Sequence, residues 1–400
     1  MRAWLLPEYI EDILPAQAAR IERLRRQMLD LFAVHGYELV MPPLLEYVES
    51  LLTGTGHDLD LQTFKLVDQL SGRTLGVRAD ITPQVARIDA HLLNRPGVTR
   101  LCYAGSVLHT LPNGMNRTRE PLQIGAELYG HAGIEGDMEV QRLMMRALEI
   151  AGARDVYLDI GHVGIFRSLV QKARIEPELE KDLFRAMQSK DLPEVHALTQ
   201  RLQRSVRDAL SALPELYGGP EILSEAARRL PGYPEIEAAL ENLRALSEQL
   251  RDVARIRCFD LAELRGYHYH SGVVFAAYAA GQPDAIARGG RYDKVGKAFG
   301  RARPATGFSM DLRELVGLAP TQHGRTGCVI APYAPQDQAL QRRIGALRAQ
   351  GTPVVIELPG HEAQRDELST GRSLVQRAGK WVIEKCGATQ RAQRGKTRRG

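Results

Sequence analysis

Cysteine is scarce in this sequence, and its spacing excludes two common roles. The 400-residue chain has four cysteines, far apart and without a C-x-x-C pair: Cys102, Cys258, Cys328 and Cys386. A zinc site or a disulfide framework needs cysteines in close or repeated spacing. The sequence therefore predicts no metal and reduced, buried thiols.

Long hydrophobic runs are also absent. No apolar stretch approaches the roughly 20 residues that a membrane-spanning helix needs. Glu8, Glu11 and Asp12 stand where a signal peptide would need an uninterrupted apolar region. With 44% hydrophobic and 25% charged residues, the composition is typical of a soluble globular protein. We therefore expect a cytoplasmic protein without membrane contact, long enough for two or three domains.

Outside one short tail, the chain carries no excess of charge. The formal net charge is +5, and residues 391–400 alone hold five basic and no acidic side chains, so the first 390 residues sum to 5 − 5 = 0. A basic tail can hold RNA or an acidic surface, or it can be an end without a role. Because the rest of the chain has no bulk attraction for polyanions, we expect no nucleic-acid partner and a disordered tail over 386–400.

The familiar fingerprints of catalysis are missing as well. The glycine-rich stretch ARGGRYDKVGKAFG at 287–300 lacks the glycine spacing of a dinucleotide-binding loop and the Gly-Lys-Ser/Thr of a phosphate-binding loop. No nucleophile elbow places a serine, and no H-E-x-x-H occurs. General motifs therefore assign no catalytic residue and no cofactor.

What the sequence does contain is a hairpin over residues 101–130. An apolar run at 101–108 is followed by turn residues at 112–114 and by an alternating run at 122–129. The alternation puts four apolar side chains on one face of the second strand and Gln123, Gly125, Glu127 and Tyr129 on the other. The gap left by Gly125 could admit a small ligand, although an exposed polar strand with a glycine bulge would look the same.

The other elements follow from hydrophobic spacing. Thr82 and Pro83 predict a helix start, with Thr82 as the N-cap and Val85, Ile88 and Leu92 on the apolar face. Helical spacing also predicts helices over 16–34 and 137–151, the second with its inward residues at 140, 143, 144, 147 and 148. Short apolar runs predict strands over 37–41, 73–78, 156–160, 257–261 and 264–278, and a strand leading into a helix over 304–318.

Grouped helices and mixed strands predict an α+β fold. We expect a core domain over 1–163 and 255–320, interrupted by a helical insertion over 164–254, where the pattern is wholly helical. A small α/β segment should cover 325–385, with strands over 328–331, 353–357 and 381–383, a helix over 338–349, and a second helix through Leu374 and Val375. Its core would be marginal alone.

Three stretches together resemble the class II histidyl-tRNA synthetase family. They are QIGAELYG at 123–130, LRGYHYHSGVVF at 264–275 and ARGGRYDKV at 287–295, in the family's order. The residues around Pro43 are similar to that class's dimer-forming first motif. The resemblance implies a synthetase-like antiparallel sheet flanked by helices, and a homodimer.

The resemblance also implies a pocket for histidine, whose three polar groups each need a partner. Asp80, Thr82 and Gln123 match positions that accept hydrogen bonds from the ammonium group, although a local turn or capping role for the first two is the simpler interpretation. Arg265 matches the cation near the carboxylate. Glu127, with Tyr269, matches the groups at the imidazole. His270 departs from the family pattern and is either a hydrogen-bonding replacement or a buried histidine.

The nucleotide half of the synthetase site does not match. His109 stands at the position of the α-phosphate arginine, and Glu314 at that of the arginine for the terminal phosphates. The remaining departures are Leu111, Pro121, Asp311 and Arg313. Arginines on transferring phosphates contribute roughly 10³- to 10⁵-fold each in well-studied enzymes. We therefore expect no adenylation, with Arg117 and Arg119 left for anion binding.

A synthetase-like chain that recognises histidine without activating it resembles the regulatory subunits of ATP phosphoribosyltransferase. That resemblance implies a short-form catalytic subunit as partner, a hetero-oligomer around a homodimer core, and L-histidine as the effector in feedback inhibition of the first step of histidine biosynthesis. Two alternatives stay open: an active histidyl-tRNA synthetase, and a scaffold that has lost histidine binding.

Overall fold

A computed structural model describes residues 4–53, 57–112, 114, 118–254, 256–318, 328–361 and 371–385. The chain divides into two compact units, residues 1–320 and 321–400, which are described separately below. The basic tail at 386–400 and Arg117 lie outside the described residues. No helix in the described ranges is long and apolar enough to cross a membrane.

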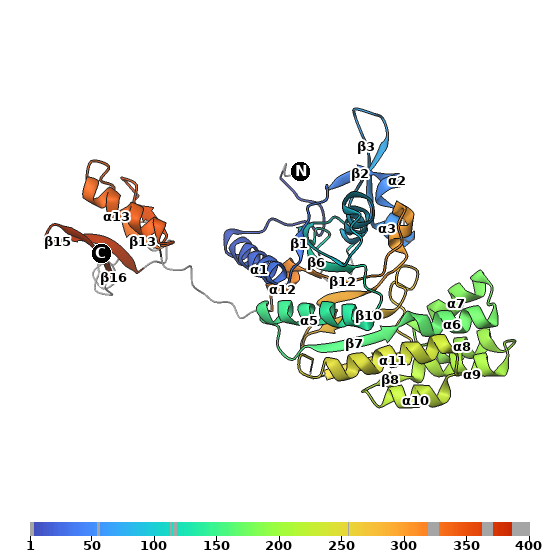
Figure 1. The fold of residues 1–400 in the computed structure, drawn as a ribbon. Helices are drawn as coiled ribbons and strands as arrows, with labels where there is room; N and C mark the ends of the chain where they lie inside the picture. The colour runs from blue at the N-terminus through green and yellow to red at the C-terminus, as the bar shows by residue number, and fades with distance from the viewer. Residues whose placement is uncertain are drawn as a thin grey trace, which may run out of the picture. The chain divides into compact units, whose positions relative to one another are not determined.

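The first unit is built on a nine-stranded, mostly antiparallel sheet (Figure 1). Only the β1–β5 and β7–β9 pairs are parallel. The two-residue β1 forms one edge of the sheet, as expected for a strand followed by Pro42 and Pro43, which cannot donate to a ladder. The order across the sheet is β1 (Glu38–Leu39), β5 (Thr99–Ser106), β6 (Leu122–Tyr129), β12 (Ala305–Asp311), β11 (Ala287–Arg291), β10 (Val273–Tyr278), β7 (Tyr157–His162), β9 (Ile256–Asp260) and β8 (Tyr217–Gly218).

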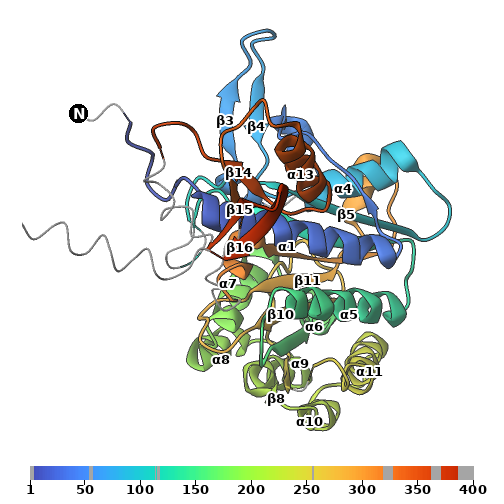
Figure 2. The same ribbon diagram turned by 90° about the vertical axis from the view of Figure 1, so that its left-hand side faces the viewer.

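Two long helices, α1 (Pro15–Val34) and α5 (Ile134–Ile150), cover one face of this sheet (Figure 2). Met28 and Phe32 of α1 join the same core cluster as the apolar face of β6. All five inward residues predicted for the second helix are buried, which confirms the helical spacing: Val140, Leu143, Met144, Ala147 and Leu148. The predicted strand-into-helix over 304–318 is confirmed too, since β12 leads directly into α12 (Leu312–Leu315).

The opposite face carries the segment around Thr82, and two expectations for it are wrong. Helix α4 begins at Thr82, so Ile81 rather than Thr82 is the N-cap. The helix then widens into a π-helix, η1 (Ile88–Leu93), whose larger turn shifts the side-chain register. Leu92 is therefore 67% exposed instead of lying on the apolar face.

A smaller three-stranded sheet stands beside this segment, in the order β2–β4–β3. Both of its strand pairs are antiparallel, and its middle strand is the one predicted over 73–78. Its strands and the adjoining short helices are β2 (Leu45–Tyr47), β4 (Thr74–Val77), β3 (Phe64–Val67), α2 (Val48–Leu51) and α3 (His57–Gln62).

Helices dominate the chain between β7 and β9 (Figure 1). They are α6 (Val163–Ala173), α7 (Pro177–Gln188), α8 (Leu192–Thr199), α9 (Arg204–Ala212), α10 (Ile222–Arg229) and α11 (Pro234–Gln249). The expectation of a wholly helical segment is wrong in one detail, because β8 pairs with β9 and extends the large sheet. A continuous strand over 264–278 is also wrong: residues before Val273 form turns, and Gly266 adopts a positive φ of 65°.

The described part of the second unit contains a four-stranded sheet in the order β14–β13–β15–β16 and the helix α13 (Gln338–Ala349). Leu340, Ile344 and Leu347 of the helix pack with the sheet in a small core. The predicted helix through Leu374 is wrong, since this residue lies in a strand hairpin whose tip uses positive φ at two positions. The strands are β13 (Val329–Ala331), β14 (Val354–Ile356), β15 (Arg372–Arg377) and β16 (Lys380–Lys385).

Candidate functional site

The sheet face opposite α1 and α5 carries the polar side chains predicted from the hairpin. Antiparallel pairing aligns β5, β6, β12 and β11, so that residues in register form rows across the face. One row runs from Tyr103 through Gly125 to Ser309. The next row contains Glu127, Gly307 and Gly290. The predicted division of β6 into an apolar and a polar face is thus confirmed.

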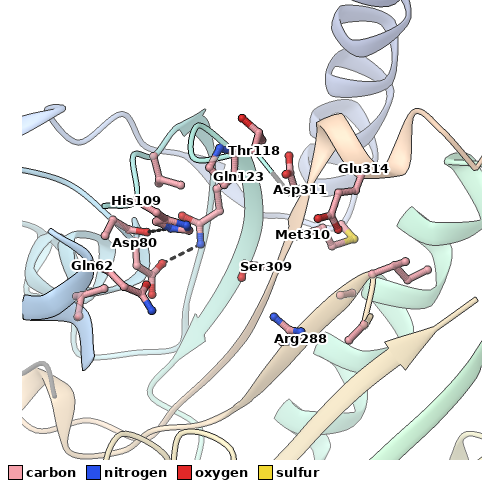
Figure 3. Close-up of a pocket in the computed structure, with 17 residues that line it drawn as sticks. Gln62, Asp80, His109, Thr118, Gln123, Arg288, Ser309, Met310, Asp311 and Glu314 are labelled. Atoms are coloured by element: carbon pink, nitrogen blue, oxygen red, sulfur yellow. Dashed lines mark hydrogen bonds between the residues drawn. The ribbon is translucent and has the colours of Figure 1, made fainter. Parts of the chain in front are cut away.

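A cavity of about 230 Å³ opens on this face (Figure 3). Asp80, His109 and Gln123 lie on one side of it, and Asp311 and Glu314 lie on the other. Arg288 and Ser309, which the sequence did not single out, line the part between them. Arg288 lies within the stretch ARGGRYDKV, but only the pairing of β11 with β12 places it beside Ser309.

Asp80 and Gln123 form one hydrogen-bonded unit at the wall of the cavity. The Gln123 amide Nε2 donates to Asp80 Oδ1 at 2.8 Å, and its oxygen accepts from the Ile81 amide at 2.9 Å. The same Asp80 oxygen accepts from the Thr82 amide at 3.0 Å. Asp80 therefore organises the helix start and also presents a carboxylate to the cavity, so the two interpretations of this residue are compatible.

Tyr103 occupies the space that Gly125 was expected to leave for a ligand. Its hydroxyl lies where a Cβ on Gly125 would stand, so the glycine admits a neighbouring tyrosine. The hydroxyl donates to Glu127 Oε1 at 3.1 Å and lies 3.1 Å from the Thr82 hydroxyl. Thr82, which is not the helix cap, is thereby connected to Glu127. No sequence motif predicted a role for Tyr103, although this residue stands directly opposite Gly125 in the ladder.

Glu127 is fully enclosed by tyrosines. The Tyr292 hydroxyl donates to Glu127 Oε2 at 2.5 Å and lies 3.2 Å from the Tyr129 hydroxyl. Burial raises the pKa of Glu127 to about 8, with the charge of Asp80 acting in the same direction and the tyrosine hydrogen bonds opposing it. At neutral pH most of the protein therefore holds a protonated Glu127. Such a carboxyl is poised to ionise when a ligand brings a positive or N–H donor group.

Tyr269 and His270 lie beside this enclosed carboxyl. The Tyr269 ring is 5.0 Å from that of Tyr292, and its buried hydroxyl has no hydrogen-bond partner among the described residues. The His270 ring covers Gly290, and its Nδ1 lies 3.3 Å from the Arg291 carbonyl. Burial lowers the pKa of His270 to about 4, so the ring is neutral. Glu127, Tyr269 and His270 come together in one region, but none of them lines the cavity of Figure 3.

Arg265 is held elsewhere on the surface of the first unit. Its guanidinium pairs with Glu263 at 2.5 Å and donates to the Tyr278 hydroxyl at 2.9 Å. Among the described residues, these hydrogen-bond partners of Arg265 do not include Asp80 or Gln123. Arg119 lies over the Phe64 ring at 5.0 Å and donates to the His109 carbonyl, so its charge is used in holding the hairpin.

The side of the cavity opposite Asp80 and Gln123 is acidic. Asp311 and Glu314 both line it. Asp311 also caps α12 and accepts from the Leu122 amide at 3.1 Å, which fixes its position. The His109 Nε2–H donates to the Ala79 carbonyl at 2.9 Å, while Leu111 is 73% exposed. Carboxylates at these positions would repel a triphosphate.

No group of three or more His, Cys, Asp or Glu side chains in the described part of the chain could hold a metal ion. Cys102 and Cys328 are buried, and Cys258 is half-buried.

Fold and site together define a class II histidyl-tRNA synthetase-like protein. The family model described as "Histidyl-tRNA synthetase" matches residues 9–315. A histidyl-tRNA synthetase from Nostoc sp. PCC 7120 superposes with a TM-score of 0.76, covering 99% of this chain and 100% of the other at 16% identity, which shows the shared fold.

More similar proteins identify the branch of this synthetase-like family to which the chain belongs. Proteins named ATP phosphoribosyltransferase regulatory subunit from Ralstonia nicotianae and Nitrosospira multiformis are 60% and 58% identical, and the alignments cover 96% of this chain and 98% of each relative. A structure from Bacillus halodurans described as an ATP phosphoribosyltransferase regulatory subunit/histidyl-tRNA synthetase has a TM-score of 0.80 at 28% identity, covering 92% of this chain and 96% of the other. The model for the ATP phosphoribosyltransferase subunit HisZ C-terminal domain matches residues 326–384. The chain belongs to the family of ATP phosphoribosyltransferase regulatory subunits.

Proposed function

We propose that this chain is a non-catalytic cytoplasmic subunit that joins a short-form ATP phosphoribosyltransferase and makes its activity sensitive to histidine. The end-to-end similarity to subunits of that name supports the partnership. The observation that carries the sensing role is the arrangement of the cavity: one side keeps the Asp80–Gln123 pair, while the other presents the carboxylates of Asp311 and Glu314. Glu127 lies outside this cavity and is connected to Thr82 through Tyr103.

Histidine fits this arrangement group by group. Its ammonium group would be bound by the Asp80 carboxylate and the second lone pair of the Gln123 oxygen. Its imidazole would replace tyrosine donors at Glu127, beside Tyr269 and His270. Its carboxylate is assigned to Arg265, which would have to exchange or share its contact with Glu263. An amino acid that left water without these partners would bind poorly.

Histidine activation is disfavoured by the same geometry. Phosphoryl-type transition states concentrate negative charge, and Asp311 and Glu314 would destabilise it. Histidine-dependent ATP–pyrophosphate exchange by the purified chain would establish the synthetase alternative and contradict our proposal.

The exposed edge of the large sheet favours a homodimer. Strand β1 lies at this edge, and apolar side chains around it are solvent-exposed in the single chain, with Met41 at 78% and Leu39 at 45%. An apolar sheet edge of this kind is usually covered by a partner. We therefore place a second copy there, within a larger assembly with the catalytic subunit.

The decisive experiment is co-purification of the chain with a short-form catalytic subunit, followed by phosphoribosyltransferase assays with and without histidine. We expect a stable complex, higher activity than the catalytic subunit alone, and inhibition by histidine. Complex formation without any heat of histidine binding in calorimetry would favour the scaffold alternative. Absence of a complex would contradict the proposal as a whole.

Replacing Asp80 with asparagine should weaken histidine binding at least tenfold. The change removes the negative charge that faces the ammonium group but keeps an oxygen for the Thr82 amide. Asp191→Asn is a matched control, because Asp191 plays the same capping role for α8 far from the cavity. Calorimetric titration of both variants with histidine checks this, and equal affinities would remove Asp80 from the site.

Replacing Arg265 with alanine should weaken histidine binding by roughly 1.5 kcal/mol or more, through loss of a charge-assisted contact. Glu263→Gln is the informative comparison, because it frees the guanidinium from its ion pair without removing it. If Arg265 binds the carboxylate, the Glu263 variant should bind histidine at least as tightly as the wild type. An unchanged affinity in Arg265→Ala would show that Arg265 serves only its pair with Glu263.

A further inference from the structure

The segment that carries Tyr269 and His270 is a succession of turns over residues 264–271. Backbone hydrogen bonds within the segment join residues close in sequence. The Tyr267 amide donates to the Leu264 carbonyl at 2.9 Å, and the His270 amide donates to the Gly266 carbonyl at 2.7 Å. Such bonds leave later carbonyls without partners from the segment itself, as at the end of a helix. The positions of Tyr269 and His270 therefore depend on what holds these carbonyls.

Arg167, on helix α6, holds them. Its guanidinium donates to the carbonyls of Tyr267 at 2.7 Å and His270 at 2.8 Å, and more weakly to that of Ser271 at 3.5 Å. It also lies over the Tyr267 ring, 4.9 Å from the centroid. Arg167 forms no ion pair with any carboxylate of the described residues, and its guanidinium hydrogen bonds go to this one segment.

Three further contacts connect the segment to the helices that follow β7. The Tyr267 hydroxyl donates to Glu180 of α7 at 2.7 Å, and the Tyr267 ring packs edge-on against Phe166 of α6 at 5.3 Å. The Phe184 ring of α7 lies 5.5 Å from the His268 ring. The outer side of the segment thus packs against α6 and α7.

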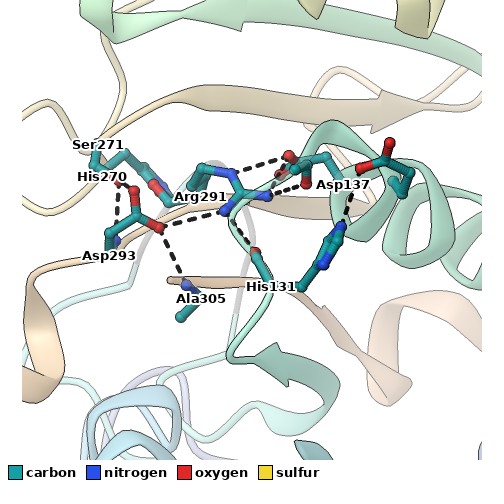
Figure 4. A network of polar contacts seen from close by, with 9 residues as sticks. His131, Asp137, His270, Ser271, Arg291, Asp293 and Ala305 are labelled. Carbon is teal, nitrogen blue, oxygen red and sulfur yellow. Dashed lines mark hydrogen bonds and ion pairs between the residues drawn. The ribbon is translucent and has the colours of Figure 1, made fainter. Parts of the chain in front are cut away.

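The inner side of the segment is fixed by the sheet (Figure 4). The Ser271 hydroxyl donates to Asp293 at 2.9 Å, and the Ser271 amide donates to the Arg291 carbonyl at 2.7 Å. Arg291 is itself held by Asp137, and Asp293 also accepts from the Ala305 amide. The inner side of the segment is therefore held by the hydrogen-bonded network of Arg291, Asp137 and Asp293. The conformation of the segment can then vary mainly on the side that Arg167 holds.

We propose that Arg167 is a positioning residue for the histidine pocket: by binding three carbonyls of residues 267–271, it sets Tyr269 and His270 against Tyr292 and Glu127, and so ties helices α6 and α7 to histidine binding. The inference rests on the proposed histidine-binding function. Its physical basis is that a site held to within a fraction of an ångström needs fixed supports as well as the right contacts. Arg167 binds His270 only through its main-chain carbonyl, so it acts through the backbone of the segment.

Two substitutions of Arg167, with side chains of similar length, separate the effect of its hydrogen bonds from that of its packing. Arg167→Met keeps an unbranched apolar stem but has no donor, whereas Arg167→Lys keeps a charge and three N–H donors. Lys172→Met is the matched control, since Lys172 is on the same helix and pairs with Glu235 instead. Each full-length protein is titrated with histidine by calorimetry, and its unfolding midpoint in urea is measured in parallel.

We expect Arg167→Met to lower histidine affinity tenfold or more, Arg167→Lys to recover most of that loss, and Lys172→Met to bind as the wild type does. Equal affinities in the methionine and lysine variants would overturn the inference, as would wild-type affinity in Arg167→Met. If Arg167→Met does not fold, a wild-type affinity in Arg167→Gln, which keeps fewer donors, would overturn it. Absence of histidine binding by the wild type would instead remove the proposed function, and the inference with it.

Discussion

Replacing Asp137 with alanine should lower the free energy of unfolding by about 3 to 5 kcal/mol, as expected when one partner of a buried ion pair is removed. Asp137 is 1% exposed and Arg291 is 7% exposed. Their bonds measure 2.6 and 3.0 Å, and the guanidinium also donates to the carbonyls of His131 and Gly133 (Figure 4). Without Asp137, the charge of Arg291 would stay buried with only Asp293, at 3.4 Å, to balance it.

Asp252→Ala provides the control for this prediction. Asp252 forms an equally short, two-pronged pair with Arg142, at 2.8 Å for both bonds, but the two side chains are 64% and 39% exposed. An exposed pair contributes only about 0 to 1 kcal/mol. Urea unfolding of both variants measures the difference. Similar losses in the two would show that burial does not decide the value of the Asp137–Arg291 pair.

Glu127 should make the protein less stable as the pH rises from about 4.5 to about 8. Its pKa is about 8 in the folded chain, against an ordinary value of 4.5. A raised pKa means that the folded state binds the proton more tightly than the unfolded state does. The contribution of this proton to the free energy of unfolding is therefore fully present below pH 4.5 and is lost as the pH rises through 8. At roughly 1.4 kcal/mol per pH unit, the upper bound on this loss in the free energy of unfolding is about 5 kcal/mol.

Glu127→Gln isolates this effect, because the amide is close in shape to the protonated carboxyl and does not ionise. The variant should gain stability relative to the wild type between pH 5 and pH 8, measured by urea unfolding at several pH values. His162 and His270, whose pKa values burial lowers to about 4, destabilise both proteins equally as the pH falls below about 6.5. A constant difference across this range would mean that Glu127 is already ionised when buried.

Glu127 is also the residue whose removal should affect ligand binding most directly. Glu127→Ala should weaken histidine binding by at least about 1.5 kcal/mol, since the carboxylate is the predicted acceptor of an imidazole N–H. Calorimetry near pH 8, where the wild-type carboxyl is partly ionised, is the suitable measurement. Unchanged binding would place the imidazole elsewhere.

The sequence was informative where one face of an element is continuously buried. The spacing of α5 and the alternation of β6 follow directly from which side chains enter the core, so both were predictable. It was misleading where a local rule competes with tertiary contacts. Leu92 is exposed because a π-turn shifts the register after Arg87, and Leu374 is a strand residue because a hairpin forms at Ala378 and Gly379.

The same distinction applies to the site. Family resemblance selected Asp80, Gln123 and Glu127, and the structure brings these residues to one face with Thr82. It could not reveal Tyr103, because the close fit of its hydroxyl over Gly125 depends on the pairing of two strands. Nor could it reveal that Arg265 is held by Glu263, only two positions away, because either residue could equally face solvent. Their roles in binding histidine stay predictions.

The paired glycines of β11 and β12 have a consequence for how such a protein could change its function. A Cβ on Gly307 would coincide with the Glu127 carboxylate, and one on Gly290 would meet His270 at 2.8 Å. The sheet beside Glu127 is therefore bare backbone at these two positions, where a larger residue would be hard to accommodate. The walls of the cavity include side chains such as His109, Asp311 and Glu314, which can be exchanged singly. If our proposal holds, substitutions on the Asp311 side could therefore remove nucleotide binding without changing the surroundings of Glu127.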